Sequence, residues 1–418
     1  MQLAAAGPDG DTELFWREWG KPPLRFPIEV PVVVTGERDT LLKSAIVESD
    51  RLMTRAIKFG DPNRQRYPKD TLAHCTARSV WDMQYHDGRV YIGCGDWQRN
   101  QGPVDIWSFG PSSAGKPHEF RKEYTVNEES VDIIRSLGGK LYVPGTDPKD
   151  PWRFGNLYVK DGDSWSKLRT IPNGIHTFDV ALFGGRLYVT CGTENGAALY
   201  ESADEGKTWT HRSAGKAQEL REGRFWGMAA FDDFLLVFPS QAQGGLYRLA
   251  GETLTQLLIP VTPNLDRCGP RSFPRAIVHR VERFRNGAVY APRAWDPVLP
   301  RPLFFLNDFV NGAVMVEAFQ SERVMDLLKR GDTLYVLTGR PTAPDVDPTA
   351  RARVDFTEFE GGILSSRDMT QWVRLATFTT TALPQSLELM EGAFYVGLAN
   401  GAARTGHPDA GSILRIER

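Results

Sequence analysis

The strongest constraint on the fold is a unit of sequence that returns seven times along the 418 residues. Each copy has an apolar run, a turn rich in glycine or aspartate, and a second apolar run that usually contains Leu-Tyr-Val or a close variant. The copies are VWDMQYHDGRVYIGCGD (80–96), VDIIRSLGGKLYVPGTD (131–147), TFDVALFGGRLYVTCGT (177–193), WGMAAFDDFLLVFPSQ (226–241), IVHRVERFRNGAVYAPRAW (277–295), VMDLLKRGDTLYVLTGR (324–340) and SLELMEGAFYVGLAN (386–400).

Each copy has the form of an antiparallel hairpin, because two apolar runs are joined by DG, GG, DD, NG or GD. Further strand-like pieces follow, such as NLYVKDG (156–162) and GGLYRLAG (244–251). Four short strands in about 50 residues, with no convincing amphipathic helix, are typical of the blades of a β-propeller. Seven copies therefore predict an all-β, seven-bladed β-propeller with four-stranded antiparallel blades.

The two ends of the chain suggest how the ring closes. The last copy runs out after its third strand at Arg418, so one strand of that blade has to come from elsewhere. The stretch RLMTRAIKFG (51–60) precedes the first full blade and is the expected closing strand. We therefore expect a propeller over residues 51–418 and a lead-in segment, residues 1–50, packed on the ring.

Composition excludes several classes of partner. The net charge is −2 and there is no long basic tract, so nucleic acid is not an expected partner. No apolar run approaches the ~20 residues that a membrane-spanning helix needs. The start, MQLAAAGPDG, lacks a charged segment followed by an apolar one, as a secretory signal would have. We expect a monomer that does not enter membranes.

The stretch SADEGKTW (202–209) places an acid pair next to a glycine and a tryptophan. It resembles the Asp-box, Ser-x-Asp-x-Gly-x-Thr-Trp, a hairpin motif of sialidases and many other propellers. Asp204 can accept hydrogen bonds from the turn backbone and Gly206 permits a positive φ. The motif is therefore interpreted as architecture at the blade periphery and not as a catalytic pair.

The resemblance to propellers implies a ligand site at the mouth, where innermost strands begin and second strands end. Arginine binds carboxylate, sulfate or phosphate groups bidentately, and tryptophan can stack on sugar faces. Glu128 and Glu129 also precede an inner strand, but no role is assigned to them. The expected substrate-binding residues are Arg78, Trp97, Arg224, Trp226, Arg271, Trp295, Arg323 and Arg340.

The preferred chemistry is β-elimination on a uronate-containing glycan. That reaction needs a cation to neutralise the carboxylate, a base for the C5 proton and an acid for the leaving oxygen. The chain resembles seven-bladed propeller polysaccharide lyases, such as ulvan lyases and the lyase acting on rhamnosyl-glucuronate, which use His, Tyr and Arg at the mouth. The candidates are His74 or His176 as base, Arg275, Arg293 or Arg78 as neutraliser, and Tyr290 as acid.

Two alternatives stay open. A glycoside hydrolase would use Asp96, Asp147 and Glu194 as its acid–base residues, and the same carboxylates are suited to calcium. A sialidase is not expected, because LRFPIEV (24–30) reverses its Arg-Phe order. The other alternative is a non-catalytic glycan-binding propeller, although the mouth positions differ between blades and favour one central site.

The expectations about cofactors and location follow from the glycan role. Elimination requires no cofactor, and a calcium or zinc ion would be structural. The partner is an acidic oligo- or polysaccharide, and the expected location is extracellular or periplasmic.

Overall fold

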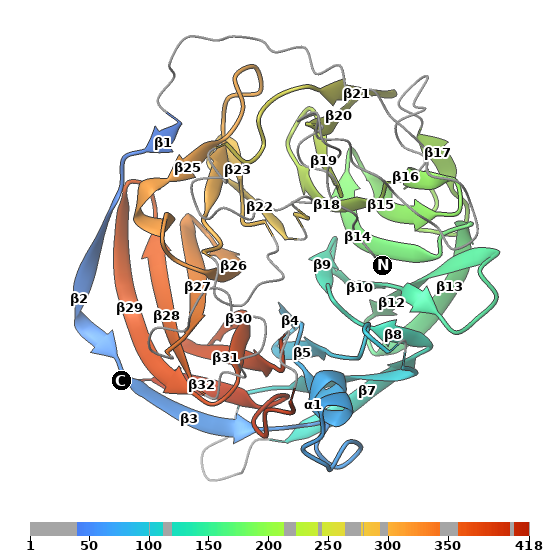
Figure 1. The fold of residues 1–418 in the computed structure, drawn as a ribbon. Helices are drawn as coiled ribbons and strands as arrows, with labels where there is room; N and C mark the ends of the chain where they lie inside the picture. Colours follow the sequence, from blue (N-terminus) through green and yellow to red (C-terminus); the bar gives the residue numbers. More distant parts are fainter. Residues whose placement is uncertain are drawn as a thin grey trace, which may run out of the picture. The chain divides into compact units, whose positions relative to one another are not determined.

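The computed structural model describes residues 40–99, 101–111, 119–212, 223–240, 245–263, 277–278, 280–292, 300–342, 358–401 and 405–417. From Thr40 onward these residues form seven antiparallel blades in a ring, with the first strand of each blade innermost (Figure 1). The predicted seven-bladed β-propeller is confirmed.

The first four blades are continuous in sequence. From the inside outward, blade 1 contains β4 (Asp82–His86), β5 (Arg89–Gly93), β6 (Val104–Phe109) and β7 (Phe120–Val126). Blade 2 contains β9 (Arg135–Leu137), β10 (Lys140–Pro144), β12 (Phe154–Asp161) and β13 (Ser164–Pro172). Blade 3 contains β14 (His176–Phe183), β15 (Arg186–Thr193), β16 (Gly196–Ser202) and β17 (Thr210–Arg212). Blade 4 contains β18 (Phe225–Ala230), β19 (Leu235–Pro239), β20 (Leu246–Ala250) and β21 (Thr253–Leu257).

The last three blades complete the ring. Blade 5 contains β22 (Val281–Phe284), β23 (Gly287–Tyr290), β24 (Phe304–Leu306) and β25 (Val314–Val316). A short 3-10 helix, η4 (Glu317–Phe319), follows it. Blade 6 contains β26 (Val324–Arg330), β27 (Thr333–Pro341), β28 (Phe359–Ser366) and β29 (Gln371–Thr380). Blade 7 contains β30 (Leu383–Met390), β31 (Ala393–Ala399), β32 (Ile413–Glu417) and, from the other end of the chain, β3 (Arg55–Gly60).

The pairing of β3 with β32 closes the ring as expected. It is antiparallel, with Arg55 opposite Glu417. The preceding chain adds two further strands: β1 (Leu41–Leu42) pairs in parallel with β25, and β2 (Ala45–Met53) pairs in parallel with β29. Residues 41–60 thus run along the outer edges of three consecutive blades. Residues 1–39 of the expected lead-in segment lie outside the described residues.

The core lies between blades and not inside one of them. A separate cluster of buried apolar side chains fills each of the seven interfaces between neighbouring blades. Between blades 7 and 1, for example, the ring of Phe59 from β3 lies 4.8 Å from that of Phe109 and 5.2 Å from that of Tyr395, centroid to centroid. Burying a side chain of this size contributes about 1.5–3 kcal/mol.

Turn chemistry explains the hairpins and the Asp-box. Asp87 and Gly88 join β4 to β5 with φ of 45° and 75°, the pair of positive values that a two-residue type I′ turn requires.

In the Asp-box, Asp204 accepts hydrogen bonds from the Thr208 amide at 2.8 Å and the Thr208 hydroxyl at 2.7 Å. The indole of Trp209 donates to Thr170 Oγ1 of blade 2 at 3.0 Å. These contacts agree with the architectural interpretation.

Buried aspartates on the inner strands of blades 1, 3 and 6 connect these blades to the next ones. Asp82, Asp179 and Asp326 accept hydrogen bonds from the backbone amides of Ile134, Met228 and Leu387 in the following blades, at 2.6, 3.0 and 2.8 Å. Arg280 forms ion pairs with Asp82 and Asp326, while Arg135 pairs with Asp179. Two guanidinium groups thus serve three buried carboxyl groups, since Arg280 is shared by Asp82 and Asp326.

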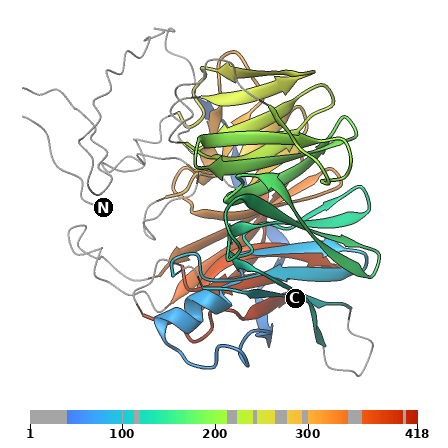
Figure 2. The same cartoon turned by 90° about the vertical axis from the view of Figure 1, so that its right-hand side faces the viewer.

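One short helix, α1 (Leu72–Arg78), precedes blade 1 and lies on one face of the ring (Figure 2). It was not expected from the sequence, because seven residues are too few to show an amphipathic period. In the described parts of the chain, no helix has the length and apolar character that crossing a membrane requires.

Candidate active site at the mouth of blades 2 to 4

Two short strands bring the mouth ends of three blades together. In sequence, β8 (Glu128–Ser130) precedes the first strand of blade 2 and β11 (Thr146–Pro148) follows its second strand. In space, the two strands pair with each other and extend the sheet of blade 3 beyond β14. Ser130 is bridged to Gly95 of blade 1 and paired with Thr146. Thr146 in turn pairs with His176 at the start of β14. This backbone frame links blades 1, 2 and 3, and His176 at its edge contacts Arg224, which directly precedes β18 of blade 4.

His176 lies between a carboxylate and a guanidinium. Its Nδ1 is 3.6 Å from Asp147 Oδ1, and its Nε2 is 3.0 Å from Arg224 Nη2. Because a guanidinium only donates, Nε2 accepts from Arg224 and the ring proton is on Nδ1, facing Asp147. Burial, reinforced by the charge of Arg224, lowers the pKa of His176 to about 3. The imidazole is therefore neutral at physiological pH.

Asp147 also contacts a second carboxyl group, that of Glu129. Burial, followed by the charges of Asp147 and Asp132, raises the pKa of Glu129 to about 9. Burial also raises the pKa of Asp147, although Arg224, Lys149 and a hydrogen bond from Glu129 oppose that rise. Glu129 thus holds a proton that it donates to Asp147. Two carboxyl groups in contact can share a proton, which suits acid–base chemistry.

The backbone of Asp147 is strained. Its φ of 59° lies in the left-handed region, which costs a residue with a side chain about 1–3 kcal/mol. Its amide donates to the Ile175 carbonyl at 3.2 Å, so the neighbouring inner strand holds this conformation. Strain of this kind is concentrated at functional positions.

An aromatic wall borders the imidazole. The ring of His176 stacks on Phe178 at 5.8 Å between centroids, and Phe178 stacks on Trp226 at 3.8 Å. The Arg224 guanidinium lies 5.7 Å from the centroid of the Phe178 ring. Phe178, Trp226 and Ile277 form a small apolar cluster. This wall lowers the polarity around His176 and holds Arg224 close to it, which together explain the depressed pKa.

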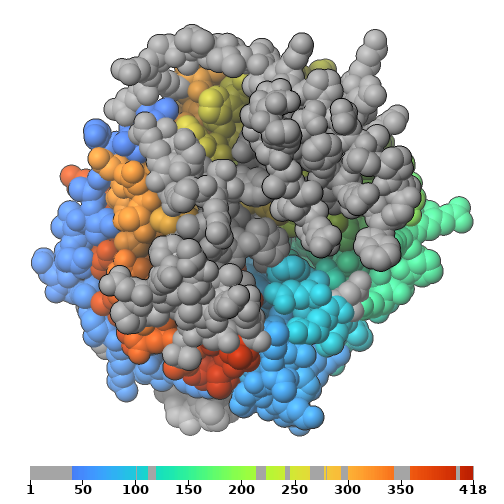
Figure 3. All heavy atoms as spheres, viewed as in Figure 1, coloured from blue at the N-terminus to red at the C-terminus, as the bar shows by residue number. Residues whose placement is uncertain are grey.

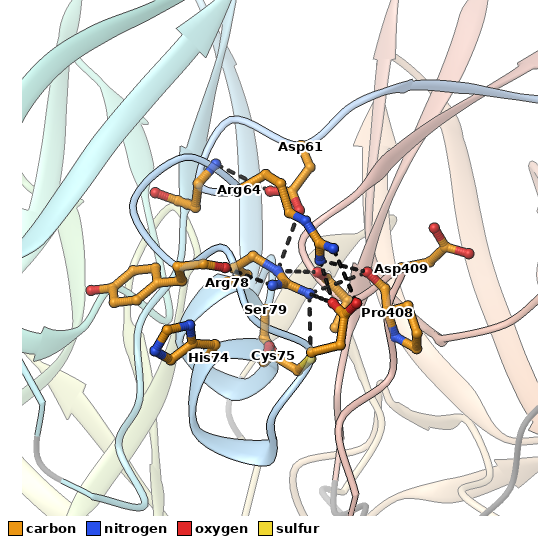
Figure 4. Close-up of polar contacts among 12 residues, drawn as sticks. Asp61, Arg64, His74, Cys75, Arg78, Ser79, Pro408 and Asp409 are labelled. Atoms are coloured by element: carbon orange, nitrogen blue, oxygen red, sulfur yellow. Dashed lines mark hydrogen bonds and ion pairs between the residues drawn. The ribbon is translucent and has the colours of Figure 1, made fainter.

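Arg78, expected as a substrate-binding or neutralising cation, has a different place. Its side chain is fully buried and lies in a network that joins α1 to the 405–411 segment of blade 7 (Figure 4). In the space-filling view, the light-blue segment with α1 meets the red atoms of the last blade (Figure 3). The contacts of the guanidinium are the carbonyls of Ala410, Tyr67, Lys69 and Pro408, Sγ of Cys75, and the carboxylates of Asp61 and Asp70. Arg78 is corrected to a structural residue, because every face of its guanidinium is occupied by protein.

Tyr290, expected as a proton donor, is corrected in the same way. It is fully buried on β23 between Phe238 and Phe304, and its hydroxyl donates to the Val261 carbonyl at 2.5 Å. Burial raises the pKa of this phenol well above its usual value. Its side chain belongs to the core between blades 4 and 5.

His74 lies on α1, where its Nδ1 accepts from the Lys69 amide at 3.1 Å and its ring meets that of Tyr67 at 5.9 Å. The described residues show no contact between His74 and the cluster around His176. Of the two expected bases, His176 is the one that has a carboxylate and a cation beside it.

The other expected residues are dispersed. Asp96 is fully buried and caps a turn, accepting from the amides of Gln98 and Arg99 at 3.0 and 3.2 Å. Glu194 is exposed in the turn between β15 and β16, and Trp97 is half-buried. Arg340 is exposed and pairs with Glu360 at 3.0 Å, whereas Arg323 is buried. The positions outside the described residues are Arg271, Arg275, Arg293 and Trp295.

The arrangement of possible ligand side chains bears on the expected metal site. Within the described ranges, no three His, Cys, Asp or Glu side chains are grouped so that they could hold one. Asp96, Asp147 and Glu194, which the sequence suggested as a calcium site, do not form such a group.

Glu129 is the site residue that sequence reasoning left without a role. The available signal was its position directly before an inner strand, beside a second glutamate. Its significance depends on burial and on two neighbouring carboxylates, and pattern alone does not reveal these.

Comparison with known proteins supports the architecture alone. No protein-family model matches the chain, and no curated protein matches it. Among solved structures, the chain is similar to one described as YCF48 bound to D1 peptide. The TM-score is 0.51 at 13% identity, over 90% of this chain and 100% of the other. It is also similar to YCF48 from Cyanidioschyzon merolae, with a TM-score of 0.50 at 12% identity, over 87% of this chain and 98% of the other. Such low identity establishes a shared fold and no shared function.

Proposed function

We propose that the chain is a carbohydrate-active enzyme that cleaves a uronate-containing glycan by β-elimination at the mouth of blades 2 to 4. The observation that carries the proposal is the grouping of Asp147, His176 and Arg224 beside a protonated Glu129. A neutral imidazole, a guanidinium and a carboxylic acid are the three groups that elimination requires.

The first step is recognition of the uronate carboxylate by Arg224. A guanidinium binds a carboxylate with two parallel hydrogen bonds, and this new partner draws it away from His176 Nε2. The negative charge also offsets the charge of Arg224, so the pKa of His176 rises towards the working pH. Neutralising the carboxylate acidifies the proton on C5.

The proton transfers then follow. His176 Nε2 takes the C5 proton, the electron pair of that bond forms the C4–C5 double bond, and the C4–O4 bond breaks. Glu129 gives its proton to the departing oxygen, and solvent later restores both groups. Asp147 stabilises the imidazolium through Nδ1, much as a buried carboxylate orients a catalytic histidine.

The test is the ultraviolet absorbance of unsaturated uronate during incubation with polygalacturonate, alginate, glucuronan and ulvan. We expect one of these to give a rising signal, and His176→Ala to reduce the rate by a factor of about 10²–10⁴, the range of general acid–base catalysis. Tyr85→Ala, an exposed aromatic residue at the opposite end of inner strand β4, is the matched control and keeps full activity. New reducing ends without absorbance would contradict elimination and support hydrolysis by Glu129 and Asp147.

A second candidate is recognition of a peptide. The observation that favours it is the likeness over most of the chain to a propeller described as bound to a peptide. Absence of turnover on the whole panel would favour this binding function.

Under the glycan proposal the protein acts outside the cytoplasm, in the periplasm or the extracellular space, as a monomer and without a required cofactor.

A further inference from the structure

The loop between β11 and β12 carries an exposed tryptophan next to the candidate active site. Trp152 is 50% exposed, although an indole usually lies in a core or an interface. Its Nε1 donates to the Pro148 carbonyl at 3.3 Å, which fixes one edge of the ring. Pro148 directly follows Asp147, so the indole is tied to the segment that supplies the site's central carboxylate.

The topology places this loop on the mouth face. The second strand of blade 2 runs towards the mouth and ends in β11, and the third strand, β12, starts back from there. Pro148 and Pro151 fix the backbone φ angle at two positions of this loop. Burial raises the pKa of both Glu129 and Asp147, and the charge of Lys149, in the same loop, opposes that rise. The loop therefore carries a cation whose charge acts on two carboxyl groups of the site.

Two arginines flank the indole. Arg153 follows it directly, and Arg169 of β13 donates to the Pro151 carbonyl at 2.6 Å. Both side chains are exposed. In the part of the chain that the structure describes, neither guanidinium has a carboxylate within ion-pairing distance. By contrast, neighbouring Lys167 is paired with Asp150. Exposed cations without an acid partner are suited to a negatively charged ligand.

We propose that Trp152, Arg153 and Arg169 form a second sugar-binding subsite, which holds an acidic sugar unit of the same glycan chain that passes through the active site. The indole face stacks on the sugar ring, and the two guanidinium groups bind its carboxylate. This inference rests on the proposed function and deepens it. The substrate is then an oligomer with at least two acidic units, and the subsite adds affinity only for longer chains.

The test measures binding separately from catalysis. Galacturonate, glucuronate and mannuronate disaccharides and hexasaccharides are titrated calorimetrically into His176→Ala, alone and combined with Trp152→Ala. We expect the single variant His176→Ala, the parent in this comparison, to bind at least one hexasaccharide. Adding Trp152→Ala is expected to weaken that binding about tenfold, which corresponds to about 1.4 kcal/mol. Disaccharide binding stays unchanged. Trp152→Phe, which keeps an aromatic face, restores most of the affinity, and Tyr85→Ala is the matched exposed-aromatic control.

The outcomes separate the two proposals. Hexasaccharide affinity that is indifferent to Trp152→Ala overturns the subsite, even if elimination is observed. Failure of the parent to bind any of the three hexasaccharides overturns it as well. Conversely, binding that depends on Trp152, with no turnover of any polysaccharide by the wild-type protein, supports the subsite and contradicts elimination. The double variant Arg153→Gln/Arg169→Gln is expected to lose hexasaccharide affinity to a similar extent. If this loss of affinity is smaller at high salt, the result supports the acidic character of the bound sugar.

Discussion

At the scale of single residues, Glu129 connects the stability of the protein with its proposed chemistry. Its pKa in the folded protein is about 9, against 4.5 for an unperturbed glutamate. Between these values the folded protein holds a proton that the unfolded chain releases. The free energy of unfolding therefore falls as the pH rises through this window.

Glu129→Gln removes this contribution. We expect the variant to lose less stability than the wild type between about pH 5 and pH 9, because the amide does not titrate. Chemical denaturation at several pH values measures the difference in slope. The same variant is expected to lose turnover at all pH values, while wild-type activity declines above about pH 9 as the acid ionises. Equal slopes would show that Glu129 is not protonated in the folded state.

Single residues also show how far sequence reasoning reaches in locating a candidate site. His176, Arg224 and Asp147 were selected because they stand at the mouth ends of strands, and the structure places them in contact. Arg78 and Tyr290 stand at comparable sequence positions, yet both side chains are buried. The direction of a side chain at a strand end depends on the neighbouring blade, which a hairpin pattern does not specify.

At the scale of elements, α1 and its last residue act as a clasp on blade 7. The guanidinium of Arg78 ties the helix to the carbonyls of Pro408 and Ala410. Its ion partner Asp61 is also buried, with a side chain only 7% exposed. The hydrogen bonds from Arg78 to Pro408 and Ala410 thus join the segment before blade 1 to blade 7 without involving β3 itself.

Replacing Arg78 should therefore destabilise the ring strongly. Arg78→Met leaves Asp61 buried without its cation, and breaking a buried pair in this way costs about 3–5 kcal/mol. Urea denaturation measures the loss. Arg367→Met is the matched control, since its pair with Asp332 is exposed on both sides and contributes little. If both variants unfold at the wild-type urea concentration, the clasp is not a source of stability. Arg78→Lys, which keeps the charge but not the planar fork, is expected to lie between them.

At the scale of the whole molecule, the ring was predictable because its signal is repeated. Each hairpin carries its own turn residues and its own apolar alternation, so seven weak local signals agree with one another. The N-terminal closing strand followed from the missing fourth strand of the last blade. The strands β1 and β2 were not predicted as parts of blades, because parallel pairing along an outer edge leaves no turn signal next to it.

Ring closure gives the last prediction. β3 completes blade 7, and its Phe59 also fills the core between blades 7 and 1, next to Phe109 and Tyr395. A chain that starts at residue 54 keeps β3 while lacking β1 and β2. We expect it to unfold in one cooperative urea transition with a slope close to that of the full chain, because the slope follows the surface exposed. A chain that starts at residue 61 exposes the unpaired edge of β32 and leaves a cavity in place of Phe59. It is expected to unfold at lower urea with a shallower transition, since blade 7 can then open separately. Identical transitions for the two chains would mean that the Arg78 clasp and the apolar interfaces close the ring without β3.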